Sequence, residues 1–330
     1  MPELIDIGLL LAGFVLLVVG GDLLVRGAVR LAERLGLSPM LIGLVIVGLG
    51  TSAPELAASV QAALAGSPGL AIGNIVGSNQ ANLLLVLGVT ALIAPLVVEK
   101  QVLWRDGGVG LIASLAFVLA SFTLGLDRIT ATVFLVGLVI YIYSAYRQEV
   151  AAKGAHGAAY DRALASEGAD PALHAEDTPQ GSLPAAIGFF VVGIGVIVAG
   201  GTLLVDSAVA IASDLGVSEA VIGLTIVAIG TSAPELVTCA IAAFKGESEI
   251  ALGNVLGSNI YNLLFIGGVT GMVAPGPVPD QIVRFDLPLA TLSAFVVMVF
   301  AWTGGKLSRT EGALLLGAYI VYMLVTSGIV

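Results

Sequence analysis

Gly50-Thr51-Ser52-Ala53-Pro54-Glu55 is a polar, proline-broken hexapeptide inside a long apolar segment. The same six residues recur 180 positions later, as Gly230-Thr231-Ser232-Ala233-Pro234-Glu235. A second block follows each copy at one distance, Gly73-Asn74-Ile75-Val76-Gly77-Ser78-Asn79 and Gly253-Asn254-Val255-Leu256-Gly257-Ser258-Asn259. The same offset relates Asn82 to Asn262, Pro95 to Pro275 and Gly20-Gly21 to Gly200-Gly201. A constant offset indicates a duplication and predicts that each half carries half of one polar site.

The composition is that of a polytopic membrane protein. Of the 330 residues, 58% are hydrophobic and 11% are charged, whereas a soluble domain carries about a quarter charged residues. The formal net charge of −10 gives no basic patch for a nucleic acid. The single cysteine, Cys239, excludes an intramolecular disulfide, and we expect it to be a small buried packing residue. No basic segment precedes the first apolar run, so we expect that run to be a membrane span and not a cleaved signal.

Apolar runs of about 20 residues predict ten transmembrane helices. They cover approximately residues 5–25, 39–64, 70–96, 107–124, 129–146, 185–205, 218–244, 250–274, 285–302 and 311–330. We divide the chain into a first five-helix repeat (1–147), a solvated linker (148–184) and a second five-helix repeat (185–330). Because five is odd, the two repeats cross the membrane in opposite directions, which is the arrangement of an inverted repeat.

Basic residues predict the orientation. With both termini outside, only Arg128 and Arg284 of the 13 lysines and arginines fall outside, as expected if cytoplasmic loops carry the positive charge. We therefore expect a multi-pass protein of the cell (inner) membrane, with the linker in the cytoplasm. His156 and His174 lie in this linker, where surface positions are a simpler explanation than a regulatory ion.

The repeated hexapeptide places a carboxylate at mid-membrane. Glu55 and Glu235 each lie about halfway along a predicted span, where a charge costs a few kcal/mol and therefore indicates function. The preceding prolines remove a backbone donor and break the helix, which frees carbonyl groups near Gly50 and Gly230. Broken helices at this depth are tolerated where they line a cavity. Further hydroxyl oxygens on the same turns come from Thr51, Ser52, Thr231 and Ser232.

The second block adds neutral oxygen atoms. Ser78 and Asn82 are four residues apart, as are Ser258 and Asn262, so each pair shares a helix face. Two carboxylates with hydroxyls, amides and carbonyls, and without thiolate or imidazole, are ligands for Ca²⁺ and Na⁺. The alternative is that these polar groups only hold helices together. We assign the glycine pairs to close helix packing and exclude Asp22 from the site, because Thr202 takes the equivalent place.

The two motifs, each present in both halves, resemble the two α-repeats of the sodium/calcium exchanger family of cation/Ca²⁺ antiporters. The resemblance implies ten helices, of which four surround ion sites at mid-membrane, and two long tilted helices, the first and sixth spans, that slide. It implies that Glu55 and Glu235 are the central ligands. The further ligands that it implies are Thr51, Ser52, Thr231, Ser232, Ser78, Ser258, Asn82, Asn262 and the carbonyls of Gly48 and Ala228.

The resemblance also implies a transporter and not an enzyme. Ca²⁺ and Na⁺ are then transported substrates, no resident cofactor is expected, and one chain in the lipid bilayer is expected to suffice. One position departs from the family, because many members carry aspartate where Asn262 stands. The asparagine at this position leaves open how many Na⁺ are exchanged for each Ca²⁺, and it argues against potassium cotransport.

Three other functions are alternatives to sodium/calcium exchange. A proton/Ca²⁺ antiporter is the nearest, since a glutamate in a low dielectric can titrate near neutrality; relatives of that type usually show Gly-Asn-x-x-Glu instead of the hexapeptide. A cation channel is less compatible with an inverted repeat. An intramembrane hydrolase with Ser52 or Ser232 as nucleophile would have no histidine or lysine base near it.

Overall fold

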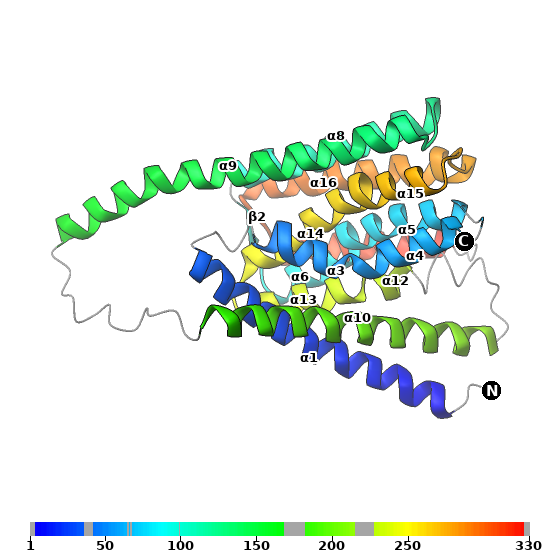
Figure 1. Cartoon of the computed structure of the whole chain (residues 1–330), viewed down its shortest axis with the longest axis horizontal. Helices are drawn as coiled ribbons and strands as arrows, with labels where there is room; N and C mark the ends of the chain where they lie inside the picture. Colours follow the sequence, from blue (N-terminus) through cyan, green and yellow to red (C-terminus); the bar gives the residue numbers. More distant parts are fainter. Residues whose placement is uncertain are drawn as a thin grey trace.

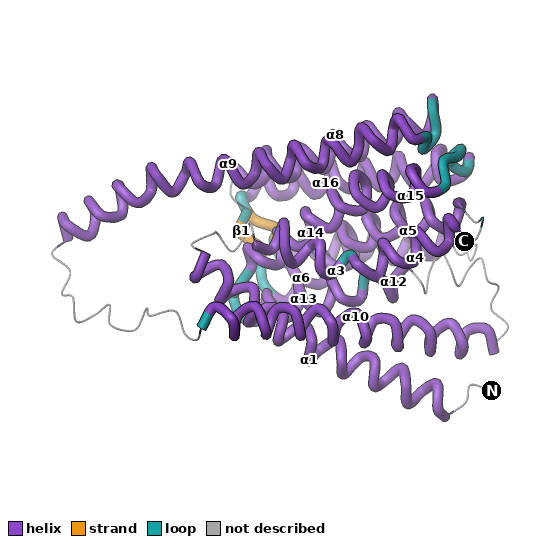
Figure 2. Tube along the Cα trace, viewed as in Figure 1, coloured by secondary structure: helices purple, strands orange, loops and turns teal. Residues whose placement is uncertain are grey.

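The computed structural model describes residues 4–35, 42–64, 66, 68–98, 100–167, 182–214 and 228–326. Nearly all of this part of the chain is helical (Figure 2). Portions of the predicted second, seventh and tenth spans (39–41, 218–227 and 327–330), and residues 168–181 of the linker, lie outside the described residues.

The helices confirm an all-α polytopic membrane protein. Within the described residues, seven helices are long and apolar enough to cross a membrane: Ile5–Ala28, Ala71–Ile93, Leu103–Thr123, Arg128–Gln148, Leu183–Leu203, Ser248–Val273 and Ile282–Gly304. Ile42–Thr51 and Ala53–Leu64, which are bent by 42° at the break between them, make an eighth if the pair counts as one span. The predicted seventh and tenth spans contribute the described helices Ala233–Phe244 and Arg309–Thr326. Ten spans therefore remain a prediction.

The two halves contain similar but not identical series of described elements. The first half contains α1 (Leu4–Leu35), η1 (Ile42–Val47), α3 (Gly48–Thr51), α4 (Ala53–Leu64), α5 (Pro68–Gln80), η2 (Ala81–Val86), α6 (Leu87–Ile93), β1 (Leu96–Val97), α7 (Lys100–Val102), η3 (Leu103–Gly107), α8 (Gly108–Thr123) and α9 (Arg128–Glu167). The second contains α10 (Leu183–Asp214), α12 (Ala228–Thr231), α13 (Ala233–Phe244), α14 (Ser248–Ile260), η6 (Tyr261–Ile266), α15 (Gly267–Val273), η7 (Ile282–Asp286), α16 (Leu287–Gly304), β2 (Lys306–Leu307) and α17 (Arg309–Thr326). The η elements are π-helical turns, in which the helix is locally wider.

The duplication is confirmed, with one correction to its offset. The bounds of α4, α5, η2 and α6 recur in α13, α14, η6 and α15 at the offset of 180. The last helix departs from it: Tyr141 donates a hydrogen bond to Asp106 (2.9 Å), and Tyr322 donates to Asp286 (3.0 Å). The aspartates keep the offset, whereas the tyrosines are one residue further apart. The second half therefore has one extra residue in the turn before α17, which is tolerated because turns accept insertions.

Backbone pairing shows that the halves are inverted. β1 pairs antiparallel with β2, with Leu96 opposite Leu307. At the other end of the molecule, Leu126 forms an isolated bridge with Gly276. Gly276 is the repeat equivalent of Leu96, and yet β1 and the turn that follows α15 lie at opposite ends (Figure 2). Equivalent turns at opposite ends are what an inverted repeat requires.

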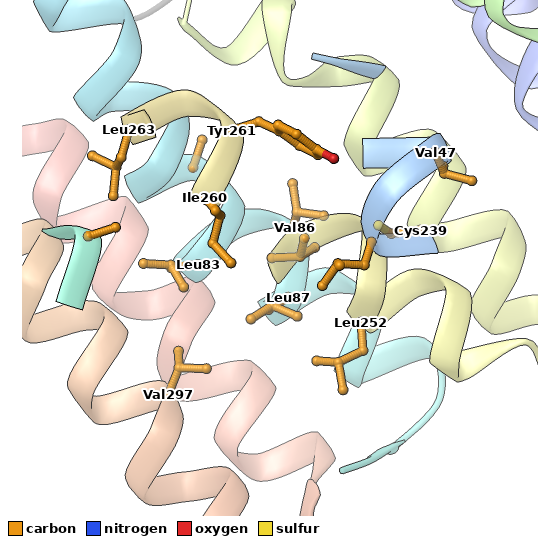
Figure 3. Packing of buried hydrophobic residues seen from close by; sticks show 14 of the residues in the cluster. Val47, Leu83, Val86, Leu87, Cys239, Leu252, Ile260, Tyr261, Leu263 and Val297 are labelled. Carbon is orange, nitrogen blue, oxygen red and sulfur yellow. The ribbon is translucent and has the colours of Figure 1, made fainter. Parts of the chain in front are cut away.

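Two spans form the centre of the protein. Ala71–Ile93 and Ser248–Val273 are 78% and 89% buried within it, against 28–39% for the other unbent spans. Their apolar side chains meet: Figure 3 shows Leu83, Val86 and Leu87 facing Ile260 and Leu252. Helices α1 and α10 lie together along one side of this centre, while α8, α9 and α16 lie along the other (Figure 1). The central spans are therefore shielded from lipid, and polar residues on them face protein.

One glycine of each pair, Gly20 and Gly200, allows α1 and α10 to touch, in keeping with the close packing that the sequence predicts. A Cβ atom added to Gly20 would lie 2.7 Å from the backbone nitrogen of Ile197. One added to Gly200 would lie 2.9 Å from the backbone nitrogen of Leu17. Neither backbone can yield without separating the helices, so only glycine permits this crossing.

The first half of the linker is helical. Helix α9 continues beyond its apolar window, Arg128–Gln148, as far as Glu167, and Figure 1 shows it projecting from the helix bundle. Alanine, glutamate and arginine are good helix formers, so the segment remains helical without an apolar face to bury. The boundary at residue 147 stays a prediction.

Asp22 lies apart from the candidate site and forms ion pairs. Its carboxylate contacts Lys245 (2.6 Å) and Arg26 (2.7 Å), and its side chain is 34% exposed. Because exposed pairs contribute little, we expect Asp22→Asn to lower the free energy of unfolding by less than about 1 kcal/mol, and less still in high salt. Thermal unfolding at low and high salt measures this. Asp280→Asn, whose contact to Arg284 is long and exposed, is the control and should change nothing.

Candidate cation-binding site

The hexapeptides break two helices at the same point. In the first half α3 ends at Thr51, Ser52 follows, and α4 begins at Ala53. Pro54 has no N–H to donate to the carbonyl of Gly50, one turn earlier. The second half repeats the break between α12 and α13 at Ser232. Each break therefore leaves backbone carbonyl oxygen beside a glutamate.

The two glutamates belong to one site. Glu55 and Glu235 are both 0% exposed. Ser52 Oγ donates a hydrogen bond to Glu235 Oε1 (3.2 Å), and Ser232 Oγ donates to Glu55 Oε1 (3.4 Å). Each serine thus binds the glutamate of the other repeat. Among the described residues, the second oxygen of each carboxylate, Oε2, has no hydrogen-bond partner.

The remaining predicted oxygen ligands surround the carboxylates unequally. Ser258 Oγ lies 3.3 Å from Glu235 Oε1 and 3.5 Å from the carbonyl oxygen of Gly48. The equivalent hydroxyl, Ser78 Oγ, is buried without a partner in the described part of the chain. Ala228 is the first residue of α12, as Gly48 is of α3. The structure thus places Gly48 at the site with the serines.

Asn82 and Asn262 lie in the π-helical turns η2 and η6. Both are 0% exposed, and neither the Oδ1 nor the Nδ2 atom of either has a partner among the described residues. Unpaired buried amides are rare because they lose solvation without compensation. Wide turns of this kind are frequent at functional sites. The sequence predicts these asparagines as ligands but gives no sign of the wide turns.

Two further asparagines were not singled out from the sequence. Asn74 accepts a hydrogen bond from Thr231 Oγ1 (3.2 Å) and donates to the backbone carbonyl of Glu55 (3.2 Å). Asn254 accepts from Thr51 Oγ1 at 3.0 Å. Each therefore joins the threonine of one repeat to the helix of the other. The sequence does indicate their importance, because asparagine stands at this position in both copies of the second block, 180 residues apart.

Cys239 is buried, as predicted, and also takes part in this network. Asn254 Nδ2 donates to its sulfur at 3.2 Å. In the first half Asn74 Nδ2 donates to Ser59 Oγ at 3.0 Å. Cys239 therefore stands where the first half has Ser59, and both side chains orient the asparagine that faces the broken helix of the other repeat.

We expect Asn254→Ala to weaken cation binding without unfolding the protein. The change removes the acceptor of the Thr51 hydroxyl and leaves that hydroxyl to bond Gly48 alone, at 3.4 Å. One hydrogen bond contributes about 1 kcal/mol, so the Ca²⁺ affinity should fall roughly tenfold or less. Calorimetric Ca²⁺ titration measures this. Thr130→Val, which removes a buried hydroxyl of α9, is the control and should leave the affinity unchanged.

The donor set fits hard cations. The described residues contain no group of three or more His, Cys, Asp or Glu that could hold a metal ion. The two carboxylates lie among hydroxyl and carbonyl oxygen atoms. Two buried carboxylates without a cation are strongly unfavourable. Oxygen ligands that are partly neutral and partly anionic suit Ca²⁺, and Na⁺ has the same preference for oxygen.

The family model for the sodium/calcium exchanger protein matches residues 5–147 and 185–328. The chain belongs to the sodium/calcium exchanger family. It is 38% identical over 315 residues to CaxA of Alkalimonas amylolytica, covering 94% of this chain and 95% of that one. It is 33% identical over 340 residues to the sodium/calcium exchanger MaX1 of Methanosarcina acetivorans, with 96% and 97% covered.

A solved structure of the family extends this similarity to the fold. The sodium-calcium exchanger NCX_Mj, soaked with Na⁺ and Ca²⁺, superposes with a TM-score of 0.80 at 29% sequence identity. The superposition covers 97% of this chain and 98% of that one. Family membership therefore rests on the whole length of the chain and not on the repeated motifs alone.

Proposed function

We propose that the protein is a secondary active antiporter that exchanges Na⁺ for Ca²⁺ and normally extrudes Ca²⁺ from the cytoplasm. The observation that carries this proposal is the pair of buried glutamates, each held by a serine of the other repeat. Each keeps one carboxylate oxygen free of partners within the described residues. The family, and the sodium-calcium exchanger NCX_Mj soaked with both ions, support the same assignment.

Shared carboxylates couple the two ions. One Ca²⁺ balances the charge of Glu55 and Glu235, and so do two Na⁺, so the ions compete for one site. An empty site leaves two buried charges uncompensated, which disfavours the closed intermediate that must form between the inward and outward states. Inverted repeats allow those two states to be related by exchanging the conformations of the halves. Exchange of bound ions is then favoured over leakage.

The proposed ligands are the residues that the sequence predicts. We assign the transported ions to the carboxylates of Glu55 and Glu235 and to the amides of Asn82 and Asn262. The other ligands are the hydroxyls or carbonyls of Thr51, Ser52, Ser78, Thr231, Ser232 and Ser258 and the carbonyls of Gly48 and Ala228. One chain supplies both halves of the site, which supports a monomer as the functional unit.

We further propose that both termini face outward and the linker faces the cytoplasm. Figure 1 shows both chain ends on one side of the molecule, and the end of α9 with the start of α10 on the other. The side with β2 also carries Lys100, Lys306 and Arg309, as the excess of positive charge in cytoplasmic loops requires.

Calcium uptake into proteoliposomes tests the coupling ion. Vesicles preloaded with Na⁺ should take up radioactive Ca²⁺ when diluted into sodium-free medium, and vesicles with only an outward proton gradient should not. Uptake driven by protons alone would overturn the proposal in favour of a proton/Ca²⁺ antiporter. Asn262 would then mark a change of the coupling ion from Na⁺ to H⁺. Uptake that needs no counter-ion and does not saturate would indicate a channel.

A further inference from the structure

Asp22 and Lys245 form an ion pair between helices of different repeats. Asp22 belongs to α1, and Lys245 directly follows α13; the Asp22 Oδ1 and Lys245 Nζ atoms are 2.6 Å apart. The chain turns at the next residue, Gly246, which has a φ of 80°. Arg26 also contacts Asp22, at 2.7 Å, but it lies on α1 itself. The contact between Asp22 and Lys245 is therefore the one that joins α1 to α13.

The sequence provides no equivalent of this ion pair in the other half. At the offset of 180, Thr202 corresponds to Asp22 and Ala65 corresponds to Lys245. The Thr202 hydroxyl donates a hydrogen bond to the carbonyl oxygen of Val198, on its own helix, at 2.9 Å. Neither residue carries a charge. The ion pair is thus present once in a molecule whose repeats otherwise carry matched motifs.

The two halves also pack differently at this place. A Cβ atom added to Gly21 of α1 would lie 3.2 Å from Cγ1 of Val237, on α13. For the equivalent Gly201 of α10, the three nearest atoms belong to Pro234 and Leu17, and none of them belongs to α4. Helix α1 therefore lies against α13, whereas α10 leaves α4 uncovered at the equivalent position.

The exposure of the two helices agrees with this packing. Val237 is half-buried and Thr238 is fully buried, while their equivalents on α4, Ala57 and Ala58, are exposed and half-buried. Figure 1 shows α12 and α13 following each other towards the side that carries β2, and α3 and α4 towards the side of the chain ends. The closed contact between α1 and α13 thus lies towards β2, and the uncovered face of α4 lies towards the chain ends.

An inverted repeat allows this asymmetry to be exchanged. In the alternating access proposed above, the halves exchange their conformations, so α1 takes against α13 the looser packing that α10 now has against α4. Asp22 and Lys245 then separate, while Arg26 stays beside Asp22 because both belong to α1. Thr202 and Ala65 form no ion pair in return. The pair therefore stabilises only one of the two conformations.

We propose that the ion pair of Asp22 and Lys245 is a latch that favours the conformation closed on the side of β2 and open on the side of the chain ends. The proposal rests on the alternating access of the proposed function and adds the residues that set the balance between its two states. An exposed ion pair shifts such an equilibrium by up to about fivefold. A latch of this strength opens readily, because Arg26 still compensates Asp22 after Lys245 has left.

Alkylation of cysteines engineered at two equivalent positions measures this balance. Val237→Cys reports opening between α1 and α13, and Ala57→Cys reports opening between α4 and α10. Each is introduced singly into the full-length protein in lipid nanodiscs with Na⁺, where a membrane-impermeant maleimide reaches both sides. The unmodified protein, whose Cys239 is 0% exposed, gives the background. The rate for Val237→Cys divided by the rate for Ala57→Cys should rise up to about fivefold when Asp22→Asn is added.

Three further variants separate the ion pair from its single charges. Lys245→Gln should raise the ratio of rates as much as Asp22→Asn does, and the double variant should raise it no further, because both changes remove the same contact. Asp22→Lys combined with Lys245→Asp exchanges the charges and should return the ratio towards that of the wild type. Arg26→Gln is the matched control: it removes the other partner of Asp22 but leaves the contact between the helices, so it should not raise the ratio.

Several results would overturn the latch. They are a ratio that Asp22→Asn and Lys245→Gln leave unchanged, additive effects in the double variant, and an equal rise in Arg26→Gln, which would assign the shift to the net charge of α1. Faster alkylation of Val237→Cys than of Ala57→Cys in the otherwise unchanged protein would show that the side of β2 is the open one.

The latch and the proposed function fail separately, because alkylation does not measure transport. A shifted ratio without sodium-driven Ca²⁺ uptake would contradict the proposed function and support the latch. Sodium-driven uptake with an unchanged ratio would contradict the latch and support the proposed function.

Discussion

Glu235→Ala is expected to reduce Ca²⁺ affinity roughly 100- to 5000-fold and to abolish sodium-dependent Ca²⁺ uptake. The carboxylate is fully buried, and removing one partner of a buried charge pair costs about 3–5 kcal/mol, which corresponds to that loss of affinity. Glu55→Ala should have a similar effect, because Ser52 and Ser232 hold the two carboxylates in equivalent ways. Calcium titration and uptake into proteoliposomes measure both.

Thermal unfolding distinguishes loss of the site from loss of the fold. Without cations, Glu235→Ala should unfold at a temperature no lower than the wild type, because it removes one of two uncompensated buried charges. Addition of Ca²⁺ should then stabilise the wild type but not the variant, since a ligand stabilises only the state that binds it. Asp280→Asn, an exposed acid, is the control and should respond like the wild type. Full sodium-dependent uptake by Glu235→Ala would place the cation site elsewhere.

Gly200→Val is expected to destabilise the protein by about 1–3 kcal/mol or more, the usual cost of overpacking a close contact. A Cβ atom at this position meets the backbone oxygen of Gly13 and the backbone nitrogen of Leu17, both at 2.9 Å. Since backbone atoms cannot rotate away, α1 and α10 must separate. Thermal unfolding in detergent and uptake into proteoliposomes should both show the defect.

Gly195→Val is the matched control on the same helix. A Cβ atom at Gly195 has no atom within 4 Å, so this variant carries the same change in helix propensity without the clash. It should unfold and transport like the wild type. Equal defects in Gly195→Val and Gly200→Val would show that α10 tolerates valine at neither position. The loss of stability and transport would then not be due to the crossing of α10 with α1.

The sequence anticipates the architecture because a duplication is visible without any structure. Identical motifs at one offset, with five apolar runs in each half, predict an inverted repeat, and the pairing of β1 with β2 and of Leu126 with Gly276 confirms the inversion. The offset of the last helix is the exception. One extra residue before α17 leaves no trace in a comparison based on motifs, because that turn contains none.

The sequence by itself determined which residue types the site contains: Glu55 and Glu235, their hydroxyl neighbours and the two breaking prolines. The carboxylate, the hydroxyls and the proline of each hexapeptide are contiguous in the sequence, so they can be recognised without knowledge of any tertiary contact. Only the tertiary structure decided that Ser52 binds the glutamate of the other repeat, 183 residues away, and that Asn254 supports Thr51. It also decided that Gln80 buries an amide without a hydrogen-bond partner among the described residues, whereas its repeat equivalent, Ile260, is apolar. Such pairings depend on how two inverted halves cross, and that crossing is set by packing between residues far apart in the chain.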